Sequence, residues 1–172
     1  MVAFKHIPMA ILMPGLFLLA ACAQQGTGEA RLSDEQLLDS IQYRTFQYFW
    51  DGAEPHSGLA RERFHVDGIY PQDDKHIITS GGGGFGIMAL VVGMERGFIT
   101  REQGMERLDR ILSFLEGSDR FHGAWPHWLN GETGKVRPFS QKDNGRDLVE
   151  TAYLVQGLLT VRPYLNRNDP VE

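Results

Sequence analysis

Three carboxylates near the C-terminal end of the chain have the residue types and the spacing that acid–base or ligand-binding chemistry requires. Asp143, Asp147 and Glu150 stand at positions i, i+4 and i+7. At about 100° per residue, this spacing places all three side chains on one stripe of an α-helix. The segment 148–159 that follows is almost entirely apolar, so the pattern predicts a buried helix whose first turns carry an acidic stripe.

A structural interpretation of these carboxylates remains open beside the chemical one. Acidic side chains favour the first turn of a helix, where they meet free N–H groups and the positive end of the dipole. Asn144 can serve as N-cap, with Asp147 three residues further on. This explains Asp147 well but Glu150 poorly, because a carboxylate in so apolar a helix needs a cation, a hydrogen-bond network, a metal or a cleft.

The N-terminus has the pattern of an export signal. Residues 1–22 combine Lys5, an apolar run and the sequence Leu-Ala-Ala-Cys, which resembles the bacterial lipobox and implies lipidation of Cys22. Residues 23–31 lack periodicity and read as a flexible tether. We therefore expect a lipid anchor in a bacterial membrane. Ala23 is not the aspartate linked to inner-membrane retention in proteobacteria, which favours the outer membrane.

Composition limits the other partners. The 172 residues carry a net charge of -5, which argues against nucleic-acid binding. Cys22 is the only cysteine, so no disulfide can form within the chain. Residues 32–172 are long enough for one domain with a modest core.

Periodicity predicts four helices, over about 33–50, 87–95, 100–115 and 144–164, and no βαβ unit. Two long loops, 51–76 and 117–138, separate them and have the length of functional loops. Asn130, Gly131 and Gly134 indicate a hairpin-like reversal in the second loop. This is an all-α pattern. Helices that are apolar almost all round need neighbours on both sides, so we expect the chain to be part of a larger domain.

The glycine run 81–86 formally matches the dinucleotide fingerprint G-x-G-x-x-G. Only Ile77 and Ile78 stand where the preceding strand should be, and no second parallel strand follows. We therefore expect no cofactor, and we interpret the glycines as positions where the backbone turns, packs closely or lines a cleft.

The second long loop gathers aromatic side chains. Trp125 and Trp128 could stack on the apolar faces of sugar rings, or could plug the loop onto the core. The spacing of His122 and His127 is a weak metal signal without a third ligand nearby, so we expect no metal. In the first long loop, Arg61 could hold a catalytic carboxylate ionised or could simply solvate the loop.

Three segments together resemble the bacterial glucoamylase-like family, whose members include β-1,2-glucanases of glycoside hydrolase family 144. They read FQYFWDGAEPHSGLARER, TSGGGGFGIMALVVGMERGFITREQGMERL and FHGAWPHWLNGETGKVRPFSQKDNGRDLVETAYLVQGLL. The resemblance implies an (α/α)6 toroid of twelve helices with a sugar cleft at one end. About four of those helices are present, so residues 32–172 correspond to an N-terminal part of such a domain, a partial toroid with long cleft-forming loops.

The resemblance also implies roles for individual residues. It places the family's acidic trio at Asp143, Asp147 and Glu150. The implied substrate-binding residues are Arg61, Gly83, Phe85, Trp125, His127 and Trp128. Inverting glycosidases hold their two carboxyls about 6.5 to 9.5 Å apart, and one helix supplies only part of such a pair, which leaves open a general acid beyond Glu172.

Two functions follow as expectations. The first is a lipid-anchored glycoside hydrolase, or its N-terminal piece, whose substrate is an oligo- or polysaccharide. The expected substrate class is β-linked glucans, and the expected member of that class is β-1,2-glucan. The second is a glycan-binding or scaffold lipoprotein without turnover. The fragment on its own is expected to be inactive.

Overall fold

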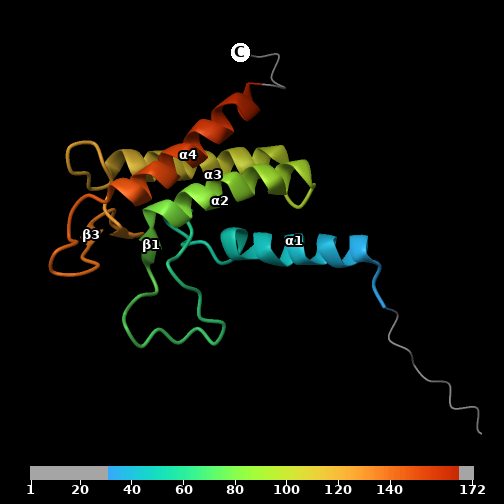
Figure 1. The fold of residues 1–172 in the computed structure, drawn as a ribbon, viewed down its shortest axis with the longest axis horizontal. Helices are drawn as coiled ribbons and strands as arrows, with labels where there is room; N and C mark the ends of the chain where they lie inside the picture. The colour runs from blue at the N-terminus through green and yellow to red at the C-terminus, as the bar shows by residue number, and fades with distance from the viewer. Residues whose placement is uncertain (1–30, 167–172) are drawn as a thin grey trace, which may run out of the picture. The chain divides into compact units, whose positions relative to one another are not determined.

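The computed structural model describes residues 31–166 and contains four helices and three short strands (Figure 1). The predicted signal segment, the tether up to residue 30 and Cys22 lie outside the described residues. In chain order the elements are α1 (Asp34–Trp50), β1 (Ile77–Thr79), α2 (Ser80–Glu95), α3 (Arg101–Gly117), β2 (Trp128–Asn130), β3 (Val136–Arg137) and α4 (Leu148–Leu165).

Two of the helix starts are fixed by local side-chain chemistry. Ser33 precedes α1 and forms a capping box with Gln36, and Thr100 does the same with Gln103 before α3. Each box satisfies two backbone N–H groups that would otherwise lack partners. Both starts were predicted from the sequence and are confirmed.

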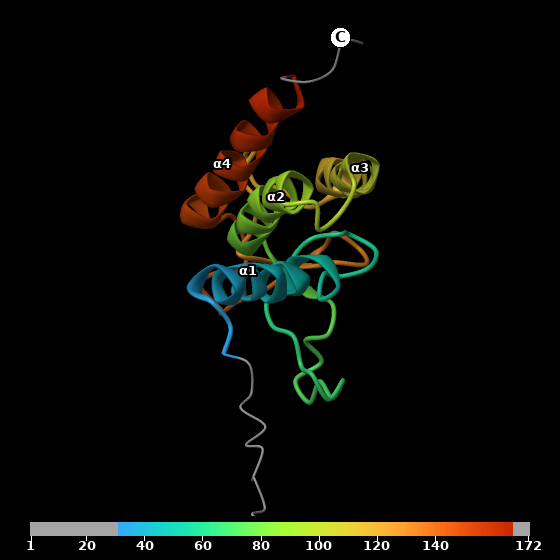
Figure 2. The same cartoon turned by 90° about the vertical axis from the view of Figure 1, so that its right-hand side faces the viewer.

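Helix α2 is the central element and contacts each of the other three helices (Figures 1 and 2). It begins at Ser80, so the expectation of a helix from residue 87 was wrong and the glycine run forms its first turns. At Gly84 an added Cβ would lie 2.1 Å from the Tyr153 carbonyl oxygen of α4, and at Gly157 it would lie 2.4 Å from the Gly84 oxygen. The glycines therefore let α2 and α4 approach each other backbone to backbone, which is the close-packing interpretation.

A small antiparallel sheet corrects the all-α prediction. Its strand order is β1-β2-β3, with Thr79 opposite Trp128 and Trp128 opposite Arg137. The expected reversal between β2 and β3 is present, since Gly134 has φ +69° and donates to the Asn130 carbonyl oxygen. The strands are only two or three residues long, too short to produce a readable alternation in the sequence.

The two faces of the sheet have different environments. Ile78 and Leu129 are fully buried and belong to the core formed with α2, α3 and α4. Because directly opposed residues share a face, Thr79, Trp128 and Arg137 lie together on the other one. The sheet thus joins the core to an outer face that carries candidate site residues.

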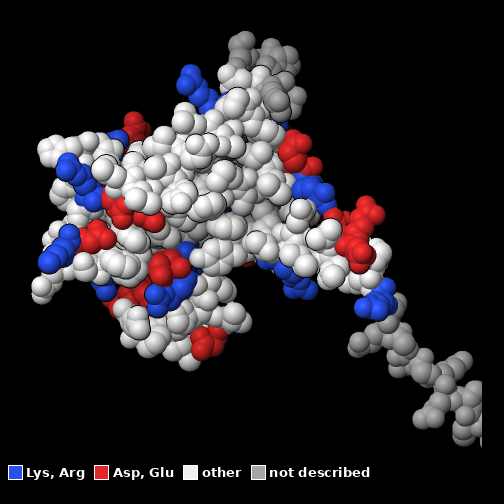
Figure 3. Space-filling model, viewed as in Figure 1, with Lys and Arg blue, Asp and Glu red and all other residues white. Residues whose placement is uncertain are grey.

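Much of the surface over α2 and α4 carries no charge (Figure 3). On α4, Leu148, Val149 and Leu159 are all more than half exposed. None of the helices in the described part of the chain has the length and apolar character that a membrane crossing requires.

Candidate functional site

A histidine paired with two aspartates forms the centre of the candidate site. The Nδ1 atom of His127 lies 3.2 Å from Asp147 Oδ2 and 3.5 Å from Asp143 Oδ2. His127 precedes β2, and both aspartates precede α4. The three side chains are 21 to 29 % exposed, so they are accessible to a ligand but partly shielded from water.

Asp147 has two tasks in this cluster. It is the N-cap of α4, and its Oδ1 accepts hydrogen bonds from the amides of Val149 at 2.9 Å and Glu150 at 3.0 Å. Its other oxygen faces His127. The prediction that Asn144 caps the helix was therefore wrong, because the helix begins one turn later than the sequence suggested.

Asp143 does not share a helical stripe with the other two carboxylates, because it lies in the loop before α4. A tight turn with Ser140 positions it, in which the Asp143 amide donates to the Ser140 carbonyl and hydroxyl oxygens. This turn brings Asp143 to His127 all the same. The prediction that the three carboxylates share one helical stripe was therefore wrong, but Asp143 and Asp147 do lie close together beside His127.

Aromatic rings surround the histidine. Phe139 stacks on the His127 ring with centroids 4.3 Å apart, and Trp128 meets Phe139 edge-on at 4.7 Å. Phe139 is half exposed and was missed by sequence reasoning, although a lone aromatic four residues before Asp143 in a polar loop was a usable signal. The cluster thus combines carboxylates with flat apolar surfaces.

Glu150 occupies a different position. Its Oε2 accepts hydrogen bonds from the Thr79 hydroxyl at 2.6 Å and from the Gly81 amide at 2.7 Å. The carboxylate therefore lies at the N-terminus of α2, where the helix dipole favours negative charge. A Cβ at Gly81 would come within 2.7 Å of the same oxygen, so glycine at this position makes room for Glu150.

The two tryptophans of the second loop differ in their surroundings. Trp125 packs against the core, and its Nε1 donates to the Ser118 hydroxyl at 3.1 Å. Its backbone exchanges two hydrogen bonds with the Thr151 hydroxyl and accepts one from the Asp147 amide. Trp125 therefore matches the plug interpretation and ties the loop to the start of α4, while Trp128 lies in the aromatic cluster.

The remaining predicted residues lie in diverse environments. Gly83 is buried, and a Cβ there would meet Leu59 at 2.8 Å, which marks it as a packing position. Phe85 is half exposed beside Tyr153. Their substrate roles stay predictions.

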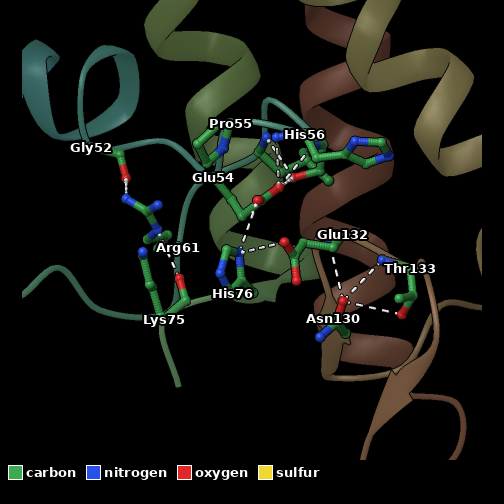
Figure 4. A network of polar contacts seen from close by, with 12 residues as sticks. Gly52, Glu54, Pro55, His56, Arg61, Lys75, His76, Asn130, Glu132 and Thr133 are labelled. Atoms are coloured by element: carbon green, nitrogen blue, oxygen red, sulfur yellow. Dashed lines mark hydrogen bonds and ion pairs between the residues drawn. The ribbon is translucent and has the colours of Figure 1, made fainter. Parts of the chain in front are cut away.

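Arg61 corrects both interpretations drawn from the sequence. It is only 7 % exposed, so it does not solvate the loop. Its guanidinium donates to the Lys75 carbonyl at 2.9 Å and to the Gly52 carbonyl at 3.1 Å (Figure 4). It forms no ion pair with a carboxylate within the described residues. Arg61 instead binds the two ends of the first long loop together.

A second polar network fixes this loop to the β2–β3 hairpin (Figure 4). The Oε2 of Glu54 accepts from the Ser57 amide and hydroxyl and from the His56 amide, and its Oε1 lies 3.2 Å from His76 Nδ1. Burial alone would raise the pKa of Glu54, but the hydrogen bonds from Ser57, His76 and His56 outweigh it and hold that pKa below its usual value. His76 also lies 3.7 Å from Glu132 in the hairpin.

The central cluster offers one ligand atom each from His127, Asp143 and Asp147, all within 4.8 Å of one another. Imidazole and carboxylate can bind a metal ion. His122, the other histidine of the weak metal signal in the sequence, is not part of this cluster. The Nδ1 atom of His127 already contacts both carboxylates directly, so the geometry does not require a metal ion. One carboxylate oxygen of Asp143 and one of Asp147 lie within 4.8 Å of each other, so the two side chains face the same space beside His127.

The fold and the site define a helical protein whose loops gather carboxylates and aromatic rings, the combination that suits sugar recognition. Comparison with known proteins agrees with this class. The chain is 64 % identical to an endo-β-1,2-glucanase from Chitinophaga pinensis, solved with sophorotriose and glucose, with a TM-score of 0.79. It is 54 % identical to a β-1,2-glucanase structure from Parabacteroides distasonis, with a TM-score of 0.73.

A curated relative from Parabacteroides distasonis, an exo-β-1,2-glucooligosaccharide sophorohydrolase, is 55 % identical over 142 residues. These matches cover 81 to 82 % of this chain, but only 19 to 34 % of the relatives' own lengths. No protein-family model matches the chain. The predicted resemblance is confirmed: the chain is homologous to a part of bacterial β-1,2-glucanases.

Proposed function

We propose that the chain is part of a lipid-anchored glycoside hydrolase of the bacterial envelope that acts on β-linked glucans, specifically β-1,2-glucan. In this proposal the four helices form a section of an (α/α)6 toroid, and the loops before β2 and α4 form part of its sugar cleft. The observation that carries the proposal is the His127–Asp143–Asp147 cluster with its aromatic rings, in a chain 64 % identical to an endo-β-1,2-glucanase.

The geometry supports distinct roles for the two aspartates. Asp147 already accepts two backbone hydrogen bonds, which fix its second oxygen toward His127. Within the described residues the Asp143 carboxylate forms no hydrogen bond and contacts only His127, at 3.5 Å. It is therefore more available than Asp147 to act as an acid or base. The proposal also includes a further carboxylate of the whole protein as the second catalytic group, as expected from the sequence.

Measuring reducing ends released from β-1,2-glucan by the full-length protein tests this proposal. Asp143→Asn is expected to lower kcat about 100-fold or more, as loss of a general acid or base typically does. Asp109→Asn, which removes an exposed carboxylate on α3, is the matched control and should not change the rate. Unchanged hydrolysis by Asp143→Asn and Asp147→Asn together would overturn the proposal.

The cap and the chemistry of Asp147 can be separated by two substitutions. Asp147→Asn keeps an oxygen that can cap α4 but removes the charge beside His127, so it should lose activity and keep most of its stability. Asp147→Ala also loses the cap, at about 0.5 to 2 kcal/mol in the free energy of unfolding. Denaturant unfolding of both variants measures the difference.

A second candidate function is glycan binding without turnover. The rings of His127, Trp128 and Phe139 favour it, because flat aromatic rings can bind the faces of sugars whether or not a bond is cleaved. It predicts saturable binding of β-1,2-gluco-oligosaccharides that Trp128→Ala weakens, with no reducing ends released. Any turnover by the full-length protein would exclude it.

The anchor has its own test. Cys22→Ser should leave the protein without lipid and release it from membranes, since burial of acyl chains contributes about 0.8 kcal/mol per CH2. Membrane fractionation in high salt measures this. A serine variant that stays with the membrane would contradict the lipid anchor while leaving the glucanase proposal intact.

A further inference from the structure

The backbone that carries His127 is held between the starts of two helices. Three consecutive carbonyl groups each accept a hydrogen bond from the first residue of α2 or from the cap of α4. On α2, the Ser80 hydroxyl donates to the Pro126 carbonyl at 2.6 Å, and the Ser80 amide donates to the His127 carbonyl at 3.2 Å. On α4, the Asp147 amide donates to the Trp125 carbonyl at 2.9 Å. The main chain that leads to His127 is therefore fixed from both sides.

Thr151 supplies a side-chain attachment from α4 to the same segment. Its hydroxyl oxygen accepts a hydrogen bond from the Trp125 amide at 2.9 Å, and the hydroxyl group donates to the Trp125 carbonyl at 3.2 Å. The Thr151 amide in turn donates to the Asp147 carbonyl at 3.0 Å. One residue thus bonds both the segment before His127 and the helix cap whose carboxylate faces His127.

The burial of these groups makes the attachments hard to replace. Ser80 is 1 % exposed and Pro126 is fully buried, so water does not reach the hydrogen bond between them. Thr151 and Trp125 are half-buried. The Ser80 and Thr151 hydroxyls bond backbone groups and not the side chains of the cluster. Any effect of these hydroxyls on the reaction must therefore act through the position of the chain that they hold.

We propose that Thr151, together with Ser80, is a positioning residue for the reaction, and that the two hydroxyls hold the His127 imidazole beside Asp143 and Asp147. The contact is sensitive to position, because Nδ1 lies 3.2 Å from Asp147 Oδ2, and a displacement of about 1 Å carries it beyond hydrogen-bond distance. Misplacement of that size can cost about 100-fold in rate. This role rests on the proposed glucanase function and assigns residues that do not touch the reacting atoms.

Thr151→Val in the full-length protein tests this role, because valine has nearly the shape of threonine but lacks the hydroxyl. The kcat for β-1,2-glucan is expected to fall about tenfold or more, while KM changes little because the hydroxyl bonds the protein backbone. Thr151→Ser keeps the hydroxyl and should restore most of the rate. Thr160→Val is the matched control on α4 and should leave kcat unchanged, since the Thr160 hydroxyl donates to the Gln156 carbonyl of its own helix.

The position of His127 can also be measured without turnover. Its ring stacks on Phe139 with centroids 4.3 Å apart, so the ring current of Phe139 shifts the His127 ring protons in an NMR spectrum. The missing signal in His127→Gln assigns that resonance. At one fixed pH it should move in Thr151→Val and stay in place in Thr151→Ser and Thr160→Val.

Three results in a folded Thr151→Val protein would overturn the positioning role. They are a native kcat, a lowered kcat with an unchanged His127 resonance, and a loss of rate that Thr151→Ser does not restore. If Thr151→Val does not fold, Ser80→Ala decides, because it removes the other hydroxyl and should lower kcat and move the same resonance. Native values of both in Ser80→Ala would overturn the role.

Failure of the proposed function gives a different result. A native full-length protein that does not hydrolyse β-1,2-glucan would overturn the glucanase proposal. The His127 resonance in Thr151→Val would still show whether the hydroxyl holds the imidazole in place.

Discussion

At the scale of single residues, the candidate site depends on Gly81, which has no side chain, as much as on the charged residues. Glu150 reaches the start of α2 because Gly81 leaves that space open, and it then accepts from the Gly81 amide and the Thr79 hydroxyl. A Cβ at this position would lie 2.7 Å from Glu150 Oε2, so the carboxylate would have to move. The identity of residue 81 therefore controls where Glu150 points.

Gly81→Ala is expected to impair hydrolysis with little change in stability. The Cβ would come 2.7 Å from Glu150 Oε2, and the flexible end of the glutamate can move away at low cost. Alanine also favours the helix by about 0.5 to 1 kcal/mol relative to glycine, so the free energy of unfolding should stay within about 1 kcal/mol of its native value. Steady-state kinetics and thermal unfolding measure the two effects.

Gly117→Ala is the control for that substitution, because no atom lies within 4 Å of the Cβ it would add at the end of α3. It should change neither kinetics nor stability appreciably. Native kinetics in Gly81→Ala would show that the position of Glu150 does not matter for the reaction.

Sequence reasoning predicted His127, Asp143 and Asp147 as site residues, and the structure brings them together, although in another geometry than expected. The prediction placed both aspartates on one helix, whereas the turn at Ser140 presents Asp143 from a loop. Such a turn depends on hydrogen bonds between neighbouring polar residues, which have no periodicity to read. Thr151 was not singled out at all, because only the folded chain shows which backbone groups its hydroxyl bonds.

At the scale of elements, the contact between α2 and α4 is the most sensitive to side-chain size. Gly84 and Gly157 face each other there, and an added Cβ at Gly84 would lie 2.1 Å from a backbone oxygen of α4. Backbone atoms cannot move aside as a flexible side chain can. The helices would have to separate, and the core between them would lose packing.

Gly84→Ala should therefore destabilise the fold by about 1 to 3 kcal/mol, the usual cost of overpacking. Gly86→Ala in the same helix is the matched control, since its nearest contact would be 3.3 Å, to the ring of Phe49, and its effect should be smaller. Denaturant unfolding gives both values. Equal stability of the two variants would contradict a backbone-to-backbone contact.

The tie between the first long loop and the β2–β3 hairpin should depend on pH. The pKa of Glu54 is lowered in the folded protein, because hydrogen bonds from Ser57 and His76 outweigh the effect of its burial. The unfolded value is about 4.3. Glu54 therefore contributes stability that is fully present above about pH 4.3 and is lost as the pH falls through the lowered folded value.

Thermal unfolding of the native protein and of Glu54→Gln across the acid range measures this contribution. The native protein should be the more stable of the two at neutral pH, and the difference should shrink below about pH 4.3. A difference in unfolding temperature that stays constant down to the acid end of the range would show that the charge of Glu54 is not involved.

Helices with capping boxes were predicted well, and the central helix was not. The side chains of Ser33 and Thr100 cap α1 and α3, so the sequence itself indicates where these helices begin. The glycine run of α2 lacks helix propensity, and it becomes helical because α4 packs on it. Tertiary contact decides that element, and the sequence alone does not display the contact.

At the scale of the whole molecule, the sequence predicted four helices that leave part of their apolar surface without a neighbouring helix. The described residues form four helices, and apolar side chains are exposed on α4. Leu148 is 68 % and Val149 is 64 % exposed at the start of α4. The surface over α2 and α4 is largely free of charge (Figure 3). Large apolar side chains are exposed on both helices, namely Phe85 and Val92 on α2 and Leu148, Val149 and Leu159 on α4, and exposed apolar side chains in such number are typical of a buried contact face rather than of a water-facing one.

Residues 23–172 expressed alone should therefore self-associate, bind hydrophobic dyes and show no glucanase activity. At about 25 cal/mol per Å2, a few hundred Å2 of wet apolar surface forfeits several kcal/mol of stabilisation, a large part of the about 5 to 15 kcal/mol of a typical domain. Replacing Leu148 and Val149 by lysine should reduce dye binding and association, because both side chains are exposed and their loss leaves no cavity. A native segment that is monomeric, binds no dye and unfolds in one sharp transition would show that these four helices need no further neighbours, and the toroid would then be the wrong architecture.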